Sequence, residues 1–386
     1  MSVDTAANVA TQILLDRLVD EGREIGVQVA AYHGDRLIVD ASAGLSDLAA
    51  RRKVDGGTLF NAFSVAKAVT ATAVHIQAER ELLEYDAPLR SYWPEFAGRG
   101  REKITVRHVL THRSGMARMP SDVTVAQICD WDHMIRVLEA TRPAFEPGSR
   151  SGYQSMTYGW LLGEVVRRTD PKGRDFRDFV RDEIAEPLGI EDLWLGIPDT
   201  EQRRVATIYD AAVTVAPADS PYRETMPIQI DLMAEAYGRP DVRRACIPAV
   251  GAIFTARSVA RFFAMLANGG TLDGVRLLSE ERVAGFSRPR DGYDDADIYS
   301  GRILPLGIGG FQLGGTLAPS AYAPRNPREL CFPGMGGSLG AADPETHLAI
   351  GFCHNRLSDF VASEEDTRAQ VFRVIEKSIA HDREEP

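Results

Sequence analysis

Residues 64–83 read SVAKAVTATAVHIQAERELL. This stretch is rich in alanine and valine, and its composition predicts a long helix. Two strand-like runs precede it, at 27–32 and 37–41, joined by the turn signal Gly34-Asp35. Helical patterning continues after it to about residue 185, so the stretch marks the boundary between a strand-forming start and a helical middle.

Strand character returns only towards the other end of the chain, at 306–313, 330–332 and 348–353. Helical patterns close both ends, up to about Gly22 and over 367–380. The expected fold class is therefore α+β, an α/β sandwich with one mostly antiparallel sheet built from both termini, flanked by terminal helices, and an inserted all-helical domain. A doubly wound parallel sheet would require regular strand–helix alternation, which is absent.

This pattern predicts a division into two domains. Residues 1–63 and 250–386 are expected to form the sheet domain, and residues 64–249 the mostly helical one. Prolines become frequent between 199 and 246, so we expect loops there that border a substrate cleft.

Composition restricts the classes of function. The chain has 386 residues and a formal net charge of −11, from 44 Lys+Arg and 55 Asp+Glu. This acidic balance repels phosphate backbones and no basic stripe is present, so nucleic acid is not an expected partner. No apolar run of membrane-spanning length and no signal-peptide pattern are present, which predicts a cytoplasmic protein without a membrane partner. The four cysteines show no CxxC spacing, as expected of buried thiols in a reducing compartment.

The most informative local feature is the pair Ser64 and Lys67. If the helix begins near Ser64, the three-residue spacing places both side chains on one face. The positive field at the helix start and burial would both lower the lysine pKa, and an uncharged amine beside a hydroxyl is an activated nucleophile pair. The alternative is that Ser64 only caps the helix and Lys67 is solvated. The neighbours Ala66, Ala68 and Val69 favour the buried reading.

Two further segments carry suitable chemistry. The first, Ser151-Gly152-Tyr153-Gln154-Ser155, places a phenol and a hydroxyl two residues apart on a turn, where Tyr153 can move a proton and Ser155 can hold the lysine. The second, residues 332–340 (FPGMGGSLG), has glycines that let a substrate approach a strand edge and a backbone N–H that suits an oxyanion.

These segments, in this order, resemble the serine β-lactamase and penicillin-binding-protein superfamily. The branch they resemble is the class C β-lactamase-like one, which includes family VIII carboxylesterases and related acyltransferases. Residues 104–116 (ITVRHVLTHRSGM) are similar to a stretch of that branch, as are Glu146-Pro147-Gly148 followed by Tyr153 and Tyr158-Gly159. Residues 186–190 (EPLGI) and 268–270 (NGG) also match, so the resemblance extends from Val27 to about Asn355.

The resemblance implies roles for particular residues. Ser64 would be the nucleophile, Lys67 and Tyr153 its general base, and the backbone N–H groups of Ser64 and Met335 the oxyanion hole. Substrate-binding positions would be Ser155, Phe332, Gly334 and Gly336. From their position in the chain, and not from the resemblance, we also expect Phe63, Trp131, Tyr237 and Phe332, with residues of the 284–330 stretch, to form walls of the substrate site.

Two positions depart from the family pattern. Ser155 stands where an asparagine is frequent, and Phe332 stands where the family has a lysine or histidine. Because an aromatic ring cannot pair with the carboxylate of a β-lactam, we expect poor β-lactam turnover and a preference for uncharged esters.

The leading functional hypothesis is a serine hydrolase that cleaves a carboxylic ester through an acyl-Ser64 intermediate. The alternative is an acyltransferase that passes the acyl group to an amine or alcohol. β-Lactamase or D-amino-acid peptidase activity is less favoured, and an inactive binding protein on the same fold remains a third reading. Partners would be a small ester or acyl donor and possibly a second, acceptor substrate.

No cofactor or metal is expected, because the histidines, including the four-apart pair His108 and His112, show no metal-ligand spacing. Residues 336–340 formally match the G-x-S-x-G elbow of α/β-hydrolases. We set that reading aside, because a strand and one helix are all that is expected after it.

Overall fold

A computed structural model describes residue 3 and residues 5–314, 326–359 and 365–382 of the chain. Its main element is a seven-stranded antiparallel sheet with the order β10-β11-β12-β13-β1-β2-β3. The strands are β1 (Gly26–His33), β2 (Arg36–Asp47), β3 (Arg52–Lys53), β10 (Gln312–Leu313), β11 (Leu330–Pro333), β12 (Leu339–Asp343) and β13 (Leu348–His354). Strands from the two ends of the chain meet where β1 pairs with β13, which confirms the predicted fold class.

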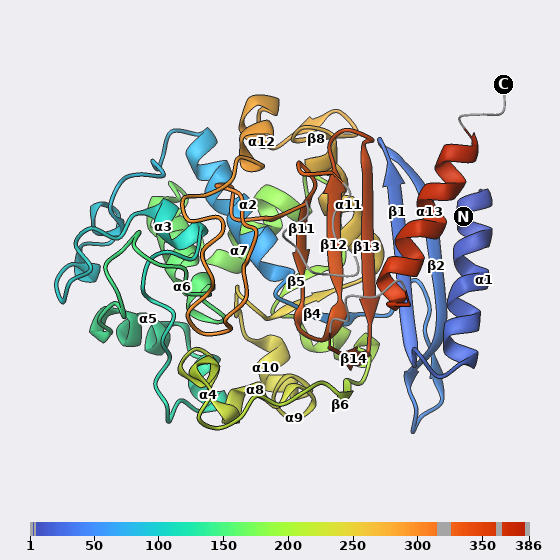
Figure 1. Cartoon of the computed structure of the whole chain (residues 1–386), viewed down its shortest axis with the longest axis horizontal. Coiled ribbons are helices and arrows are strands. Elements are labelled where there is room, and N and C mark those ends of the chain that lie inside the picture. Colours follow the sequence, from blue (N-terminus) through green and yellow to red (C-terminus); the bar gives the residue numbers. More distant parts are fainter. Residues whose placement is uncertain (1–2, 4, 315–325, 360–364, 383–386) are drawn as a thin grey trace.

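Helices cover both faces of this sheet. The terminal helices α1 (Ala6–Asp20) and α13 (Thr367–Asp382) contact each other on one face, and α11 (Ala256–Ala267) packs on β1, β12 and β13 from the other (Figure 1). Successive side chains of a strand point to opposite faces, so Val29 joins the core under the terminal helices and Ala30 the core under α11. A Cβ at Gly351 of β13 would lie 2.3 Å from the Ala256 carbonyl oxygen, so glycine is required for α11 to approach this closely.

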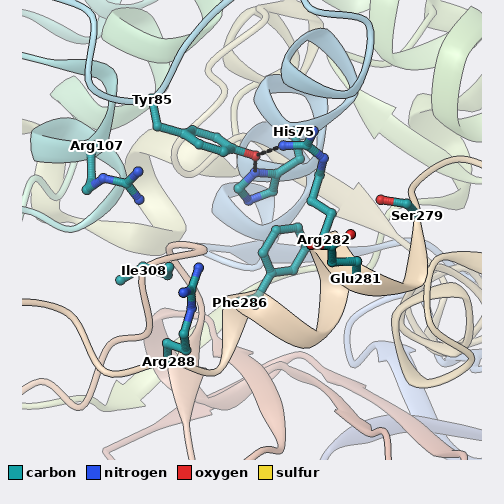
Figure 2. Close-up of a pocket in the computed structure, with 10 residues that line it drawn as sticks. His75, Tyr85, Arg107, Ser279, Glu281, Arg282, Phe286, Arg288 and Ile308 are labelled. Atoms are coloured by element: carbon teal, nitrogen blue, oxygen red, sulfur yellow. Dashed lines mark hydrogen bonds between the residues drawn. The ribbon is translucent and has the colours of Figure 1, made fainter.

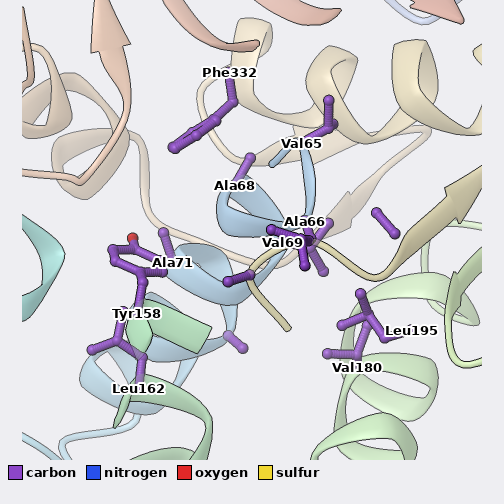
Figure 3. Close-up of a cluster of buried hydrophobic side chains, with 14 of the residues drawn as sticks. Val65, Ala66, Ala68, Val69, Ala71, Tyr158, Leu162, Val180, Leu195 and Phe332 are labelled. Carbon is purple, nitrogen blue, oxygen red and sulfur yellow. The ribbon is translucent and has the colours of Figure 1, made fainter. Parts of the chain in front are cut away.

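The helical part is built around α2 (Ala66–Glu79), whose residues are buried up to Ala78. It packs against α6 (Thr157–Thr169) and takes part in a hydrophobic cluster that also includes Phe332 of β11 (Figure 3). Further helices are α3 (Val106–Leu110), α4 (Val125–Ile128), α5 (Trp131–Ala140), α7 (Phe176–Val180), α8 (Ile228–Asp231), α9 (Met233–Tyr237), α10 (Pro240–Arg244) and α12 (Glu280–Phe286). Turns of 3₁₀-helix are η1 (Leu89–Ser91), η2 (Pro94–Phe96), η4 (Asp199–Arg204), η5 (Pro221–Glu224) and η6 (Met335–Gly337), and η3 (Arg181–Ala185) is a π-helical turn.

Small sheets link the two parts. Strand β7 (Ala252–Phe254) pairs with β4 (Phe60–Phe63) and β5 (Leu193–Leu195), β14 (Arg356–Ser358) runs parallel to β6 (Tyr209–Ala212), and β8 (Thr271–Leu272) pairs with β9 (Val275–Arg276). One hydrophobic core includes residues of α2, α6, β4, β7 and α11 and therefore runs through both predicted domains. The division into a sheet domain of residues 1–63 and 250–386 and a mostly helical domain of residues 64–249 stays a prediction.

Two segments differ from their expected structure. The run 306–313 forms a strand only at Gln312–Leu313, because Gly307, Gly309 and Gly310 interrupt it and Gly310 adopts a positive φ of 82°. The stretch 199–246, expected as loops, contains five short helices. Two of its prolines, Pro221 and Pro240, occupy the first helical turn, where a missing N–H costs nothing. Over the described parts of the chain, none of the helices combines the length and apolar character needed to cross a bilayer.

Candidate active site

Ser64 lies on a strained turn between β4 and α2. Phe63, the last residue of β4, has a φ of 46°, a left-handed conformation that is costly for a bulky residue. Its ring is held edge-on against Tyr237, with centroids 5.4 Å apart. The Lys67 N–H already donates to the Ser64 carbonyl at 2.9 Å, so helical turns begin at Ser64 and the predicted shared face forms. This sharp turn leaves the Ser64 side chain half-buried at the start of a buried helix.

Lys67 is fully buried beside Ser64. Its Nζ lies 3.0 Å from Ser64 Oγ, 2.9 Å from the Ser155 carbonyl oxygen and 3.0 Å from the Ala249 carbonyl oxygen. Burial holds the pKa of this amine well below its ordinary value. A neutral amine has two hydrogens and one lone pair. In the neutral amine the two carbonyls can accept both hydrogens, which would direct the lone pair to the Ser64 hydroxyl.

Tyr153 completes the triad that the sequence suggested. Its side chain hydrogen-bonds Ser64, and its ring centroid lies 5.1 Å from Lys67 Nζ. Burial raises the pKa of the phenol, and the hydrogen bond to Ser64 opposes this only in part. The phenol is therefore protonated at neutral pH.

His112 supports Tyr153 from behind, a role that sequence reasoning missed. Its ring centroid is 4.4 Å from that of Tyr153 and 4.9 Å from that of Tyr158. Because its Nδ1 accepts the Gln154 N–H at 3.0 Å, the ring proton resides on Nε2. Burial keeps the pKa of His112 well below its ordinary value, so the ring is neutral. The sequence feature that could have identified His112 is its place in the 104–116 stretch.

Asp297 is the second support that was missed. This buried carboxylate accepts the backbone N–H of Tyr153 through Oδ2. Its Oδ1 accepts the Tyr299 N–H at 3.2 Å, the Ser300 N–H at 2.8 Å and the Ser300 hydroxyl at 2.9 Å. A buried carboxylate that accepts from four donors is a rigid anchor, and this one fixes the backbone at Tyr153.

The turn Gly334–Ser338 brings Met335 to the same cavity as Ser64. A Cβ at Gly334 would lie 2.2 Å from the Ala62 carbonyl oxygen, so glycine is needed for the turn to reach β4. Gly336, with a φ of 78°, reverses the chain, and its carbonyl accepts from His354 Nε2 at 2.8 Å. Gly334 and Gly336 thus shape the turn and do not line the cavity. Ser338 is fully buried between this turn and β12, which excludes a strand-to-helix elbow.

The cavity at Ser64 is small and mostly apolar. It has a volume of about 50 Å³, and none of the described residues that line it carries a carboxylate, guanidinium or ammonium group. It is lined by Phe63, Ser64, Tyr153, Ser155, Tyr222, Met226, Met233, Tyr237, Val250 and Met335. Such walls suit an uncharged ligand.

Three predicted residues take positions other than those expected. The Ser155 hydroxyl bonds Thr225 Oγ1 at 3.0 Å, and it is the Ser155 carbonyl that holds Lys67. Phe332 is fully buried and packs with the α2 cluster instead of lining the cavity, because strand alternation points its ring into the core (Figure 3). The expectation that its ring contacts substrate is corrected accordingly. Trp131 lines a different cavity, with Phe176.

Comparison with known proteins adds to this geometry. The family described as Beta-lactamase matches residues 14–373. The curated protein named Esterase/beta-lactamase LipL, from Mycobacterium tuberculosis, is 31% identical over 375 residues, covering 93% of this chain and 83% of that protein. A crystal structure of a family VIII carboxylesterase superposes with a TM-score of 0.85 at 27% identity, covering 98% of this chain and 99% of that one. A penicillin-binding protein homolog from Caulobacter crescentus gives a TM-score of 0.84 at 28% identity, with 98% and 99% covered.

Proposed function

This chain belongs to the beta-lactamase family, and on that premise we propose that it cleaves small uncharged carboxylic esters through an acyl-Ser64 intermediate. The recognised resemblance is confirmed by the family match, and the esterase relatives support a serine ester hydrolase. The observation that carries the finer proposal is the Lys67 amine, which is buried against two carbonyls and Ser64 Oγ and has no carboxylate among its hydrogen-bond partners in the described part of the chain.

The acylation step follows from these contacts. The lone pair of Lys67 takes the Ser64 proton as Oγ attacks the ester carbonyl. The backbone N–H groups of Ser64 and Met335 would stabilise the oxyanion, an effect of about 3 kcal/mol for each donor. When the carbon–oxygen bond breaks, Tyr153 gives its proton to the leaving alkoxide and recovers one from the Lys67 ammonium.

Deacylation would run through the same groups in reverse. A water molecule attacks the acyl-Ser64 carbonyl, and its proton passes through Tyr153 and Lys67. As the tetrahedral intermediate collapses, Ser64 leaves with a proton and the acid is released. Residues Lys67 and Tyr153 end in their starting protonation states, so the cycle consumes only ester and water.

The cavity favours an uncharged ester over a β-lactam. The described residues of its lining offer no cation for a substrate carboxylate, and by the family resemblance Phe332 stands where a lysine or histidine is usual. Burying an unpaired carboxylate among methionine and aromatic side chains is costly. We therefore propose that carboxylate-bearing β-lactams are poor substrates.

A fluorophosphonate probe followed by intact-mass measurement tests this proposal. We expect one adduct, located on Ser64 by peptide mapping, no adduct in Ser64→Ala and strongly slowed labelling in Lys67→Met. Hydrolysis of p-nitrophenyl acetate should fall in parallel, while Lys103→Met, which changes an exposed lysine, serves as the control. Labelling that persists in Ser64→Ala, or that is equally fast in Lys67→Met, would refute the assignment.

The apolar cavity also favours a second candidate, acyl transfer. The cavity walls include Met226, Met233, Tyr222 and Tyr237. These apolar walls favour an alcohol, which carries apolar surface, over water as the acceptor of the acyl group. Product analysis with p-nitrophenyl acetate and added 1-butanol distinguishes the two reactions. Butyl acetate in excess of acetate would assign a transferase, and acetate alone would assign a hydrolase.

A further inference from the structure

Besides the cavity lined by Trp131, two cavities larger than the one at Ser64 share none of its described lining residues. The first, of about 320 Å³, is bordered by α2, α12 and Tyr85 (Figure 2). The second, of about 460 Å³, is bordered by α3 and residues 288–291. Arg107, Arg288 and Ile308 line both, so the two cavities adjoin at these residues.

Arginines dominate the charge of this cavity pair. Five arginines of the described residues line it, namely Arg107, Arg113, Arg282, Arg288 and Arg290. Three of them are paired with a carboxylate. Arg107 binds Asp86 at 2.6 and 2.8 Å, Arg113 binds Asp295 at 2.7 Å, and Arg282 binds Glu79. The other two have no carboxylate partner among the residues that the structure describes, although the chain as a whole carries a net charge of −11.

Arg290 is a buried cation with incomplete hydrogen bonding. Its side chain belongs to a residue only 3% exposed, and its Nε and Nη1 have no acceptor within the described residues. Its Nη2 donates to Ser151 Oγ at 2.8 Å. Asp295 and Asp297 favour its charge but are engaged by Arg113 and by the Tyr153 N–H. Burial lowers the pKa of Arg290 to about 10, so the guanidinium is still charged at neutral pH.

Of the two arginines without a described carboxylate partner, Arg288 is the exposed one. Its side chain makes no hydrogen bond or ion pair with any residue that the structure describes. Figure 2 shows it extending from the segment after α12 towards the space that Arg107 also faces. Arg107 uses Nε and Nη2 for Asp86, which leaves its Nη1 for a ligand. The exposed carboxylates of Glu281 and Asp291 also line the cavities, where water screens them.

The floor of the first cavity is uncharged and aromatic. His75 stacks on Phe286 with ring centroids 4.0 Å apart, and burial lowers its pKa to about 3, so it is neutral. The Tyr85 hydroxyl is already occupied by His75 Nδ1 and Arg282 Nη1, each at 2.8 Å (Figure 2). An apolar floor below cationic groups fits a ligand with a carbon skeleton and an anionic end.

We propose that this cavity pair is a second ligand site, which binds the oxyanion of a small organic molecule between Arg107 and Arg288. Planar guanidinium groups bind carboxylate and phosphate oxygens through paired hydrogen bonds, and both anions share this chemistry. Arg290 contributes a fixed positive charge behind the site. The aromatic floor of His75 and Phe286 receives the carbon skeleton.

Calorimetric titration with two probes, inorganic phosphate and succinate, tests the site at constant ionic strength. We expect saturable binding of at least one probe by the wild type, about tenfold weaker in Arg288→Gln. The control is Arg136→Gln, which changes an exposed, unpaired arginine of the described α5 and should leave binding unchanged. Binding of phosphate alone, of succinate alone or of both identifies which oxyanion the site accepts.

Other results would overturn the proposal. These are absence of binding for both probes, equal affinities in wild type and Arg288→Gln, and equal weakening in Arg288→Gln and Arg136→Gln. Unchanged thermal unfolding of the variants shows that they fold. Ser64→Ala should bind the probes like the wild type, so the outcome is independent of the proposed hydrolase chemistry.

Discussion

Lys67 differs from an ordinary buried lysine because, within the described residues, its hydrogen-bond partners are two carbonyls and a hydroxyl. Its replacement in Lys67→Met removes the base but keeps the volume of the side chain. We expect kcat/KM for p-nitrophenyl acetate to fall about 10³-fold, within the range of general-base contributions. Steady-state kinetics measure this, and an unaltered kcat/KM would show that another group takes the proton.

The same residue determines a pH dependence. Because burial lowers the Lys67 pKa, the active free amine is present above that pKa and is lost as the pH falls through it. The kcat/KM profile of the wild type should therefore decline on its acidic side. The residual activity of Lys67→Met should lack this decline, and an identical acidic limb in the variant would assign it to a different group.

Asp297 is expected to act through Tyr153 and not on substrate. In Asp297→Asn the charged acceptor of the Tyr153 N–H becomes a neutral amide, so the phenol loses part of its fixed position. We expect kcat to fall about tenfold with little change in KM. Asp294→Asn, an exposed neighbour, is the control. A change confined to KM would instead point to a role in substrate binding.

A sequence pattern can predict contacts between residues a few positions apart, but it does not predict contacts between residues far apart along the chain. Ser64 and Lys67 are three residues apart, so one helical turn predicts their proximity. His112 and Asp297 contact the Tyr153 segment across separations of 42 and 144 residues, which no local pattern encodes. His112 and Asp297 were therefore missed, whereas the pair Ser64 and Lys67 at the helix start was found.

At the scale of elements, the contact between the turn after β11 and strand β4 positions Met335. In Gly334→Ala the new Cβ would meet the Ala62 carbonyl 2.2 Å away, so the turn has to move off β4. We expect kcat to drop about 10²-fold, as for the loss of an oxyanion donor. Gly57→Ala, where the nearest atom to a Cβ is 3.5 Å away, should be almost neutral. Equal kcat values in the two variants would contradict the role given to this turn.

The type of element was predictable where the sequence pattern was strong. The prediction failed where a glycine or proline is compatible with more than one type of structure. Alternation and length predicted the sheet strands 27–32 and 348–353, both found within longer or equal strands. The prolines of 199–246 suggested loops, but Pro221 and Pro240 begin helical turns. The face to which Phe332 points depends on which helix packs on β11, and that is decided by tertiary structure.

The whole molecule should lose stability in acid through its buried neutral histidines. Burial lowers the pKa of His75 to about 3, against an unfolded value near 6.5. Between these values the unfolded chain binds more protons, so stability falls as the pH falls. From pH 7 to 5 one such histidine accounts for about 2 kcal/mol. Urea unfolding of wild type and His75→Gln should show a smaller acid loss in the variant; equal losses would mean that His75 is protonated in the fold.

The uncharged state of Lys67 is the central claim, and the chain has only five lysines with which to examine it. The most direct measurement is an NMR titration of the lysine side-chain nitrogens in selectively labelled protein, with the Lys67 signal assigned by its loss in Lys67→Met. At pH 7 we predict one free-amine signal, from Lys67, beside four ammonium signals. A Lys67 nitrogen that stays an ammonium up to the ordinary lysine pKa would contradict the account.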